Sequence, residues 1–355
     1  MKEHETLIQS DSPLSPAYAV CEKTENAVYF YIFYPTRDKE RQLKRCWVCN
    51  CREAPDQLDA GDKLSMMPKG TFNHAPEGIT VHPDGIIWFE DGDSAALLEK
   101  GEILAIIPPK YGLFDFPGFA KYAVGQNRYA WELSGEIKQY MDKKMRELDY
   151  FWQLTGQQKF WESAQSYHLR IYEEFFGGKH TGYYAIDDNK FPMRAVIEGK
   201  KRGVTYGITA FLSMFTQPLI ETAVRDAEQH RRIEFGFAAV DALSDSVKTE
   251  AYNCFMSLAK YIYYDGVFFA HGHTNTWEGI PGCHAFLFLN PHAISGMESP
   301  VFKDFGGDRV NLLWAVPITK EEYDFTVKFG VNKLLACASD PSRVHIFDGR
   351  PKFEI

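Results

Sequence analysis

Hydrophobic positions in the first third of the chain come in short runs separated by turn residues. Ala27–Tyr34 is a continuous run of β-branched and aromatic residues closed by Pro35, and it predicts a β-strand. Arg45–Cys51 alternates roughly between apolar and polar positions, which indicates a second strand. Ile103–Pro108 is a compact apolar run and predicts a third. This part of the chain is therefore expected to be rich in β-structure.

Two further elements are expected between the second and third of these strands. Asp84-Gly85 is a typical hairpin dipeptide, so Gly78–Gly85 and Ile86–Glu90 are expected to pair as a β-hairpin. Ser94 stands directly before the alanine- and leucine-rich segment Ala95–Lys100. Because serine is a common N-cap residue, this segment is predicted to be a short helix.

From about Gly135 the pattern changes to that of amphipathic helices. The segment 136–154 carries apolar side chains on one helical stripe: Ile137, Met141, Met145 and Leu148. Residues 158–176 repeat the helical pattern and end at Gly177-Gly178, a natural C-terminal stop. The first of these helices is the candidate junction between two domains, which we place at residues 1–150 and 151–355.

The remainder of the chain alternates between strand-like and helix-like segments. The expected strands are apolar runs: Arg194–Glu198, Gly203–Thr209, Glu234–Ala239, Ala285–Leu289 and Val310–Val316. The expected helices have apolar residues at helical spacing: Thr249–Tyr263 and Thr319–Gly330. The sequence contains no internal repeat, low-complexity tract or heptad run. These elements predict the α+β class, with mixed sheets covered by a few helices in two domains.

The charge of the chain bears on the kind of partner it can bind. Its 355 residues carry a formal net charge of −9. Residues 1–150 hold 18 Lys and Arg against 24 Asp and Glu, and the rest holds 21 against 24. An acidic surface repels phosphate backbones and anionic lipids, so neither nucleic acid nor a membrane surface is expected as a partner. A basic protein partner would be favoured.

Segments that direct proteins to membranes or to secretion are not evident in the sequence. Met1–Thr6 carries acidic residues and no apolar run, unlike a secretory signal. The apolar runs are far shorter than the roughly 20 residues that a membrane helix needs. The seven cysteines are an odd number and are scattered, which is typical of reduced thiols. The expectation is a soluble cytoplasmic protein.

Cys46, Cys49 and Cys51 are the cysteines whose spacing resembles a metal motif. A structural zinc site needs a second pair of ligands, however, and the next cysteine is Cys254. On a strand, Cys46 would face one side of the sheet, while Cys49 and Cys51 would share the other. The sequence therefore favours buried thiols in a core strand over a metal site.

The loop Gly266–Gly282 and the residues after it hold the densest cluster of potential ligands. His271 and His273 flank a glycine, and further candidates follow: Trp277, Cys283, His284 and His292. One interpretation is a metal-dependent hydrolase, in which the paired histidines bind the metal with a carboxylate from Asp265 or Glu278. The other is a glycine-rich loop with polar side chains at a domain edge, where binding surfaces often lie.

The segment Arg231–Gly236 places charges directly before a predicted strand. It is either a solvated turn or an ion-paired polar element that lines a pocket. The sequence contains no nucleophile elbow and no phosphate loop, and the glycines of the loop 266–282 do not have the spacing of a dinucleotide fingerprint. We therefore expect no enzymatic activity and thus no catalytic residue, cofactor or bound metal.

The C-terminal part of the chain resembles the Suppressor of fused family. The segment 310–325, VNLLWAVPITKEEYDF, continues to Phe329–Leu335 and is similar to the closing segment of that domain. There, a strand of the form Leu-Leu-Trp-x-x-Pro-Ile leads into a helix opened by a Thr-x-x-Glu capping box. Upstream segments fit the same domain in order: Tyr172–Gly177, Val204–Gly207, Arg232–Gly236 and Gly272–Thr274. The resemblance covers residues 155–340, and the first 150 residues resemble no family.

The resemblance implies a binding protein rather than an enzyme. In animals the family's namesake restrains zinc-finger transcription factors of the Hedgehog pathway by clamping a short extended peptide. Bacterial members are thought to be immunity proteins that neutralise toxins, and this chain, without disordered regulatory insertions, fits the bacterial branch better. The leading hypothesis is an intracellular antitoxin that masks a basic toxin or effector through a groove or a sheet edge. The alternative is a regulatory scaffold that sequesters a transcription factor.

The residues expected to bind the partner lie in and near the glycine-rich loop. His271, His273 and Trp277 are expected to line the binding surface, with Arg232 and Glu234 as polar neighbours. The loop Pro108–Gly118 and the stretch Arg128–Glu132 are expected near the junction between the domains.

Overall fold

The fold is described from a computed structural model, which describes residues 4–34, 42–58, 66–186, 191–243 and 245–355. The chain forms two compact units. The N-terminal unit contains residues 1–156 with two short later segments, 221–225 and 263–266, and the C-terminal unit contains the remainder. We retain residues 1–150 and 151–355 as the proposed domains.

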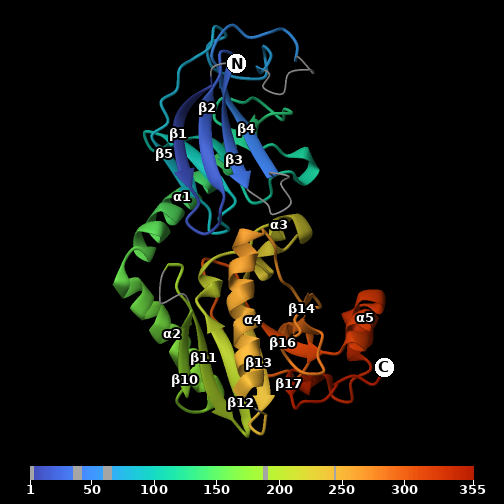
Figure 1. The fold of residues 1–355 in the computed structure, drawn as a ribbon. Helices are drawn as coiled ribbons and strands as arrows, with labels where there is room; N and C mark the ends of the chain where they lie inside the picture. The colour runs from blue at the N-terminus through green and yellow to red at the C-terminus, as the bar shows by residue number, and fades with distance from the viewer. Residues whose placement is uncertain (1–3, 35–41, 59–65, 187–190, 244) are drawn as a thin grey trace. The chain divides into compact units, whose positions relative to one another are not determined.

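The N-terminal unit is built around two β-sheets (Figure 1). The first is antiparallel, with strands in chain order: β1 (Glu5–Asp11), β2 (Tyr18–Lys23), β3 (Ala27–Tyr34) and β4 (Gln42–Asn50). The second also follows chain order: β5 (Gly85–Trp88), β6 (Ala95–Glu99), β7 (Glu102–Ile107), β8 (Phe119–Ala120) and β9 (Trp131–Glu132). Strands β3, β4 and β7 coincide with the three strands predicted first from the sequence.

The second sheet is a middle layer with both faces buried. On β6, Ala95 and Leu97 pack into the core shared with the first sheet. Ala96 and Leu98 face the other way and pack with Met141 and Met145 of helix α1 (Gly135–Thr155). Because side chains alternate along a strand, a strand buried on both faces consists of a continuous apolar run. The predicted helix at residues 136–154 is confirmed by α1.

Two predictions in this unit are wrong. The segment Ala95–Lys100 is strand β6, not a helix, because both of its faces are covered by apolar layers that override the helix propensity of alanine and leucine. Residues 78–84 form no strand, so the hairpin expected at Asp84-Gly85 is absent. Strand β5 pairs instead with β6, through a turn in which the Phe89 N–H bonds to the Ser94 carbonyl.

The C-terminal unit contains one mixed sheet. Its strands are β10 (Gly182–Ile186), β11 (Arg194–Lys201), β12 (Val204–Ala210), β13 (Arg232–Val240), β14 (Thr274–Thr276), β15 (Ala285–Leu289), β16 (Val310–Ile318) and β17 (Ile346–Phe347). Their order is β10-β11-β12-β13-β16-β15-β14, and β17 pairs with β13. The pairs β13–β16 and β13–β17 are parallel, whereas the others are antiparallel.

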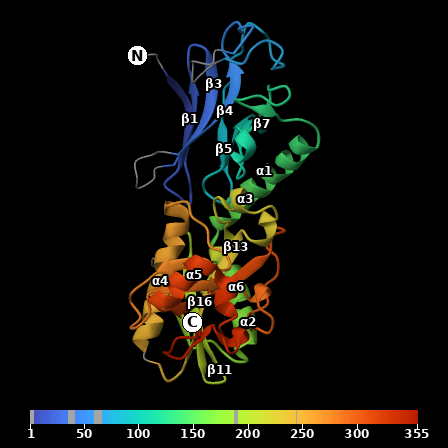
Figure 2. The ribbon, with the colours of Figure 1, turned by 90° about the vertical axis from the view of Figure 1, so that its right-hand side faces the viewer.

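Helices α2 (Gln158–Phe176) and α4 (Asp245–Tyr264) cover opposite faces of this sheet. A Cβ at Gly199 would lie 2.0 Å from the Phe176 ring of α2, and one at Gly207 would lie 2.1 Å from the Tyr252 ring of α4. Gly199 pairs with Tyr206, the residue before Gly207, so the two glycines face opposite sides. Both glycines let a helix approach the sheet closely. Figure 2 shows α4 and α2 on either side of the sheet.

The helix predicted at Thr319–Gly330 is confirmed. Helix α5 (Lys320–Phe329) begins with the predicted capping box, in which the Glu322 N–H donates to Thr319 Oγ1 and the Thr319 N–H donates to Glu322 Oε2. In the part of the chain that the structure describes, the other short helices are α3 (Ile220–Ala223) and α6 (Val331–Leu335), with 3-10 turns η1 (Leu113–Asp115), η3 (Leu212–Met214), η4 (Ala227–Gln229), η5 (Pro291–Ala293) and η6 (Pro341–Arg343). Sheets with helical covers confirm the α+β class. Among the helices of the described residues, none is long and apolar enough to span a membrane.

Candidate partner-binding site

The loop that follows α4 leads into strand β14, and both predicted histidines precede that strand. His271 Nδ1 accepts a hydrogen bond of 3.2 Å from the backbone N–H of Asn290. Burial lowers the pKa of His271, which keeps the ring neutral and therefore able to accept this bond. The His273 ring lies against Phe268, with the ring centroids 5.4 Å apart. His271 thus ties the loop to the sheet, while His273 is half-exposed beside β14.

Strand β14 is the edge strand of the C-terminal sheet, paired among the described residues with β15 alone. The His273 carbonyl accepts from Phe288, and the Trp277 N–H donates to the His284 carbonyl. Hydrogen-bonding direction alternates along a strand, so the N–H and C=O groups of Thr274 and Thr276 point away from β15. An exposed edge of this kind can accept a further strand.

Trp277 lies directly after this edge strand and is half-buried. Its indole Nε1 is shielded from solvent and has no hydrogen-bond partner among the described residues. A Cβ at Gly279 would lie 2.7 Å from this nitrogen and 2.1 Å from Glu250 Oε2, so the indole and the Glu250 carboxylate converge over the glycine. Glu278 beside it is exposed. The end of β14 therefore combines an aromatic side chain with two carboxylates.

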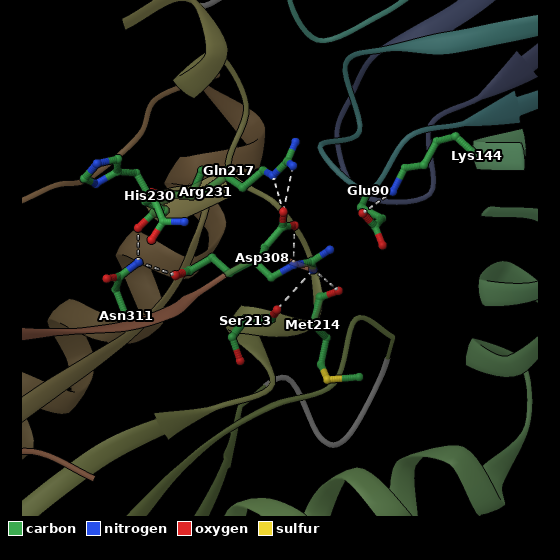
Figure 3. A network of polar contacts seen from close by, with 11 residues as sticks. Glu90, Lys144, Ser213, Met214, Gln217, His230, Arg231, Asp308 and Asn311 are labelled. Atoms are coloured by element: carbon green, nitrogen blue, oxygen red, sulfur yellow. Dashed lines mark hydrogen bonds and ion pairs between the residues drawn. The ribbon is translucent and has the colours of Figure 1, made fainter. Parts of the chain in front are cut away.

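Arg232 lies at the start of β13 and is fully buried. Its Nε donates to Asp308 Oδ2 at 2.9 Å, and its Nη1 donates to the carbonyls of Ser213 and Met214 (Figure 3). Arg231 Nη2 lies 2.6 Å from the other oxygen of Asp308. A buried charge is tolerated when it is paired and hydrogen-bonded, as it is here.

Glu234 lies two residues further along the same face of β13 and is also fully buried. Its Oε2 accepts from Thr209 Oγ1 at 2.6 Å, and its Oε1 accepts from the hydroxyl and the N–H of Ser213. His168 Nε2 of α2 lies 3.4 Å from Oε1, while its Nδ1 lies 2.8 Å from the Ala164 carbonyl. Arg231–Gly236 is therefore an ion-paired polar element and not a solvated turn. That it lines a pocket stays a prediction.

The structure brings the predicted residues together indirectly. His271 accepts from the Asn290 backbone, Asn290 Nδ2 donates to Asn311 Oδ1 at 3.0 Å, and Asn311 Nδ2 lies 3.4 Å from the Arg232 carbonyl. The side chains of Arg232 and Glu234 are buried in the core, so we assign them a role in holding the sheet and loop rather than in touching a partner. Trp277, with His273, remains at the edge.

Several members of this network were missed by the sequence reasoning, chiefly Asp308, Asn290 and Asn311. Asn311 is the one polar residue in the otherwise apolar strand β16, and Asn290 directly follows the apolar strand β15. A polar residue in such a run needs hydrogen-bond partners when it is buried. That signal could have identified both asparagines, whereas Asp308 stands in a turn-like sequence that gives no comparable signal.

The three cysteines of the metal-like motif lie at β4. Cys46 and Cys49 are fully buried, as the strand pattern predicts, and burial raises the pKa of Cys46. A hydrogen bond between Cys49 and Cys51 raises the pKa of Cys49 and lowers that of Cys51. Among the residues that the structure describes, no group of three or more His, Cys, Asp or Glu side chains is placed to hold a metal ion.

A concave surface in the N-terminal unit was not predicted. It is a cavity of about 750 Å³ beside η1. Phe114 and Asp115 there have φ of 54° and 59°, and Phe114 is 88% exposed. Such a backbone is strained for a bulky residue. The guanidinium groups of Arg45 and Arg128 lie 5.6 and 5.7 Å from the Tyr129 ring centroid. Exposed aromatic residues with arginines are typical of interface hot spots.

Comparison with known proteins bears on the C-terminal unit. No curated protein matches the chain. The family model described as Suppressor of fused protein matches residues 192–350. The match includes the strand and capped helix that carried the resemblance, β16 and α5, whereas the segment Tyr172–Gly177 lies outside it. A domain of this family suggests a protein-binding, regulatory role. The match therefore bears out the predicted resemblance of the C-terminal part of the chain to the Suppressor of fused family, over residues 192–350.

Proposed function

We propose that this protein is a non-catalytic binding protein that takes up an extended segment of a partner at the edge of β14. The observation that carries the proposal is the open edge of this strand, with the backbone groups of Thr274 and Thr276 directed outward. Added strands gain affinity from main-chain hydrogen bonds and specificity from neighbouring side chains. His273 and Trp277 flank the strand on either side and supply those side chains.

The charge around the edge favours a basic partner. Glu250 converges with the Trp277 indole, and Glu278 is exposed next to it. The whole chain carries −9, and charge complementarity accelerates association with a partner of opposite sign. We therefore propose that the partner is a basic toxin or effector protein, and that the protein acts as an intracellular immunity protein. A transcription factor as partner would instead make the protein a regulatory scaffold.

The buried network of Arg232, Glu234 and Asp308 supports this surface from within the sheet. It fixes β13 to η3 and, through Asn311 and Asn290, ends at the loop that contains His271. Because a rigid edge loses less conformational entropy when a strand binds, such a support increases affinity without touching the partner.

The proposal is tested by comparing three full-length baits in a pull-down from the cells that make the protein, with mass spectrometry as the readout. The baits are the unaltered chain, Thr276→Pro and Thr276→Ala. Proline removes the outward N–H of Thr276 and is tolerated on edge strands, whereas alanine keeps that N–H. We expect one dominant basic protein with the unaltered chain and with Thr276→Ala, and at least about ten-fold less of it with Thr276→Pro.

Two results would contradict the proposal in different ways. Equal recovery with Thr276→Pro and Thr276→Ala would show that the partner does not bind the edge of β14. Recovery of a transcription factor, or of an acidic protein, would leave the binding surface intact and refute the toxin as partner. Circular dichroism of the three baits checks that each is folded to the same extent.

A further inference from the structure

A cavity of about 220 Å³ lies in the C-terminal unit and contains none of the residues proposed to bind the protein partner. Three segments far apart in the sequence form its wall, and one of them contributes Gly296 and Glu298. Lys201 and Arg202 come from the end of β11 and the turn that follows, whereas Ser342, Arg343 and His345 come from η6 and the residues after it. The volume is much larger than a single water molecule needs.

His345 is the unusual member of this wall. It is 2% exposed, and neither ring nitrogen has a hydrogen-bond partner among the described residues. A backbone group of Ser342 lies nearby without reaching hydrogen-bond geometry. The ring stacks on Trp314, with centroids 5.0 Å apart and planes 27° apart. Buried polar groups are normally satisfied, so the edge of this fixed ring is a place where a bound molecule supplies the partner.

The other polar side chains of the wall are mainly cationic. Lys201 Nζ lies 2.7 Å from Glu298 Oε2, and Arg202 Nη1 lies 3.9 Å from Oε1 of the same carboxylate. With Arg343, the wall has three cationic side chains and one carboxylate, that of Glu298. Asp340 is close as well, but it accepts hydrogen bonds from the N–H and hydroxyl of Ser342 at the start of η6. A cationic cavity in a chain of net charge −9 points to an anionic ligand.

We propose that this cavity binds the phosphate group of a small phosphorylated molecule. Arginine and lysine form short, charge-assisted hydrogen bonds with phosphate oxygens, and the guanidinium of Arg343 offers the forked geometry that suits them. His345 would meet the ligand from the buried end of the cavity. Lys201 and Arg202 would exchange part of their contact with Glu298 for the phosphate.

The protonation state of His345 is compatible with this arrangement. Burial lowers its pKa to about 4, and the positive charge of Arg343 acts in the same direction, whereas Glu298 and Asp340 oppose it. The ring is therefore neutral near pH 7, with one N–H donor and one acceptor nitrogen. A neutral ring can donate one hydrogen bond to a phosphate oxygen without the cost of burying an additional charge.

The test is isothermal titration calorimetry of the full-length chain in phosphate-free buffer at pH 7. The two probes are inorganic phosphate and ribose 5-phosphate, and the variants are Arg343→Gln and Arg202→Gln. Both positions are exposed, so we expect the variants to fold. Arg309→Gln is the matched control, because Arg309 is exposed and lies outside the cavity wall. We expect Arg343→Gln to weaken binding at least about ten-fold, as loss of a charge-assisted contact does, and Arg309→Gln to leave it unchanged.

The two probes distinguish the source of the phosphate. Tighter binding of ribose 5-phosphate identifies a phosphate ester as the ligand class, whereas equal or tighter binding of inorganic phosphate identifies the free ion. Either result supports the cavity as a phosphate site if Arg343→Gln weakens the binding. Absence of binding by both probes at millimolar concentration would overturn the proposal. Equal effects of Arg343→Gln and Arg309→Gln on binding would also overturn the proposal, because binding would then depend only on the net charge of the protein and not on the cavity.

Discussion

At the scale of single residues, burial separates the side chains that support the fold from those that can meet a partner. Arg232 and Glu234 are completely buried, and each is held by several hydrogen bonds. Trp277 is only half-buried and keeps an unsatisfied indole N–H beside the edge of β14. A tryptophan with this combination is typical of an interface anchor, because its ring buries much area and its N–H still seeks an acceptor.

Substituting Trp277 by alanine is therefore expected to weaken partner binding by at least about 2 kcal/mol, the cost of losing a hot-spot side chain. The measurement is calorimetric titration of the unaltered chain and the variant with the captured partner, alongside thermal unfolding of both. A loss of folding without a specific loss of affinity would make Trp277 a core residue and would contradict its role as an anchor.

The buried charges give a second prediction at this scale. Asp308→Asn removes the negative charge that Arg231 and Arg232 contact, at 2.6 and 2.9 Å. Breaking a buried ion pair by neutralising one partner typically costs about 3–5 kcal/mol, so the free energy of unfolding in urea should fall by this order. Asp304→Asn, at an exposed position four residues earlier, should change it by less than about 0.5 kcal/mol. Equal effects of the two variants would show that the network does not stabilise the fold.

At the scale of elements, the sequence correctly predicted the helices and strands whose local residue pattern agrees with their place in the fold. The strand β3 is a continuous run of β-branched and aromatic residues, and the helix α1 has one apolar stripe. Helix α5 has a capping box that also forms in the structure. The segment Ala95–Lys100 was assigned wrongly because alanine and leucine fit a helix locally. Its strand conformation depends on apolar layers contributed by segments far away in the sequence, which local patterns do not contain.

In the candidate site too, the sequence indicated what is local and missed what the fold brings together. The loop with His271, His273 and Trp277 could be singled out because its polar and aromatic residues stand together in the sequence. The partners of Arg232 could not, since Asp308 and Ser213 are brought to it by the topology of the sheet. Spatial neighbours that lie 76 and 19 residues away leave no mark on the local sequence. The edge position of β14 likewise follows from strand order alone.

At the scale of the whole molecule, each compact unit carries a surface suited to binding. The C-terminal unit offers the acidic edge of β14, and the N-terminal unit offers the cavity with Phe114, Arg45 and Arg128. The two surfaces differ in charge, since arginines favour acidic segments and Glu250 and Glu278 favour basic ones. A basic partner is therefore expected to use the β14 edge, and the Phe114 surface serves as an internal comparison.

The central claim is most directly tested by hydrogen–deuterium exchange of the full-length chain, free and in complex with the captured partner. An added strand pairs the outward amides of Thr274 and Thr276, so exchange in residues 270–278 should slow at least about ten-fold, while exchange around Phe114 should stay unchanged. Unchanged exchange in residues 270–278 within a fully formed complex, or protection confined to the Phe114 surface, would contradict the claim that the partner binds at β14.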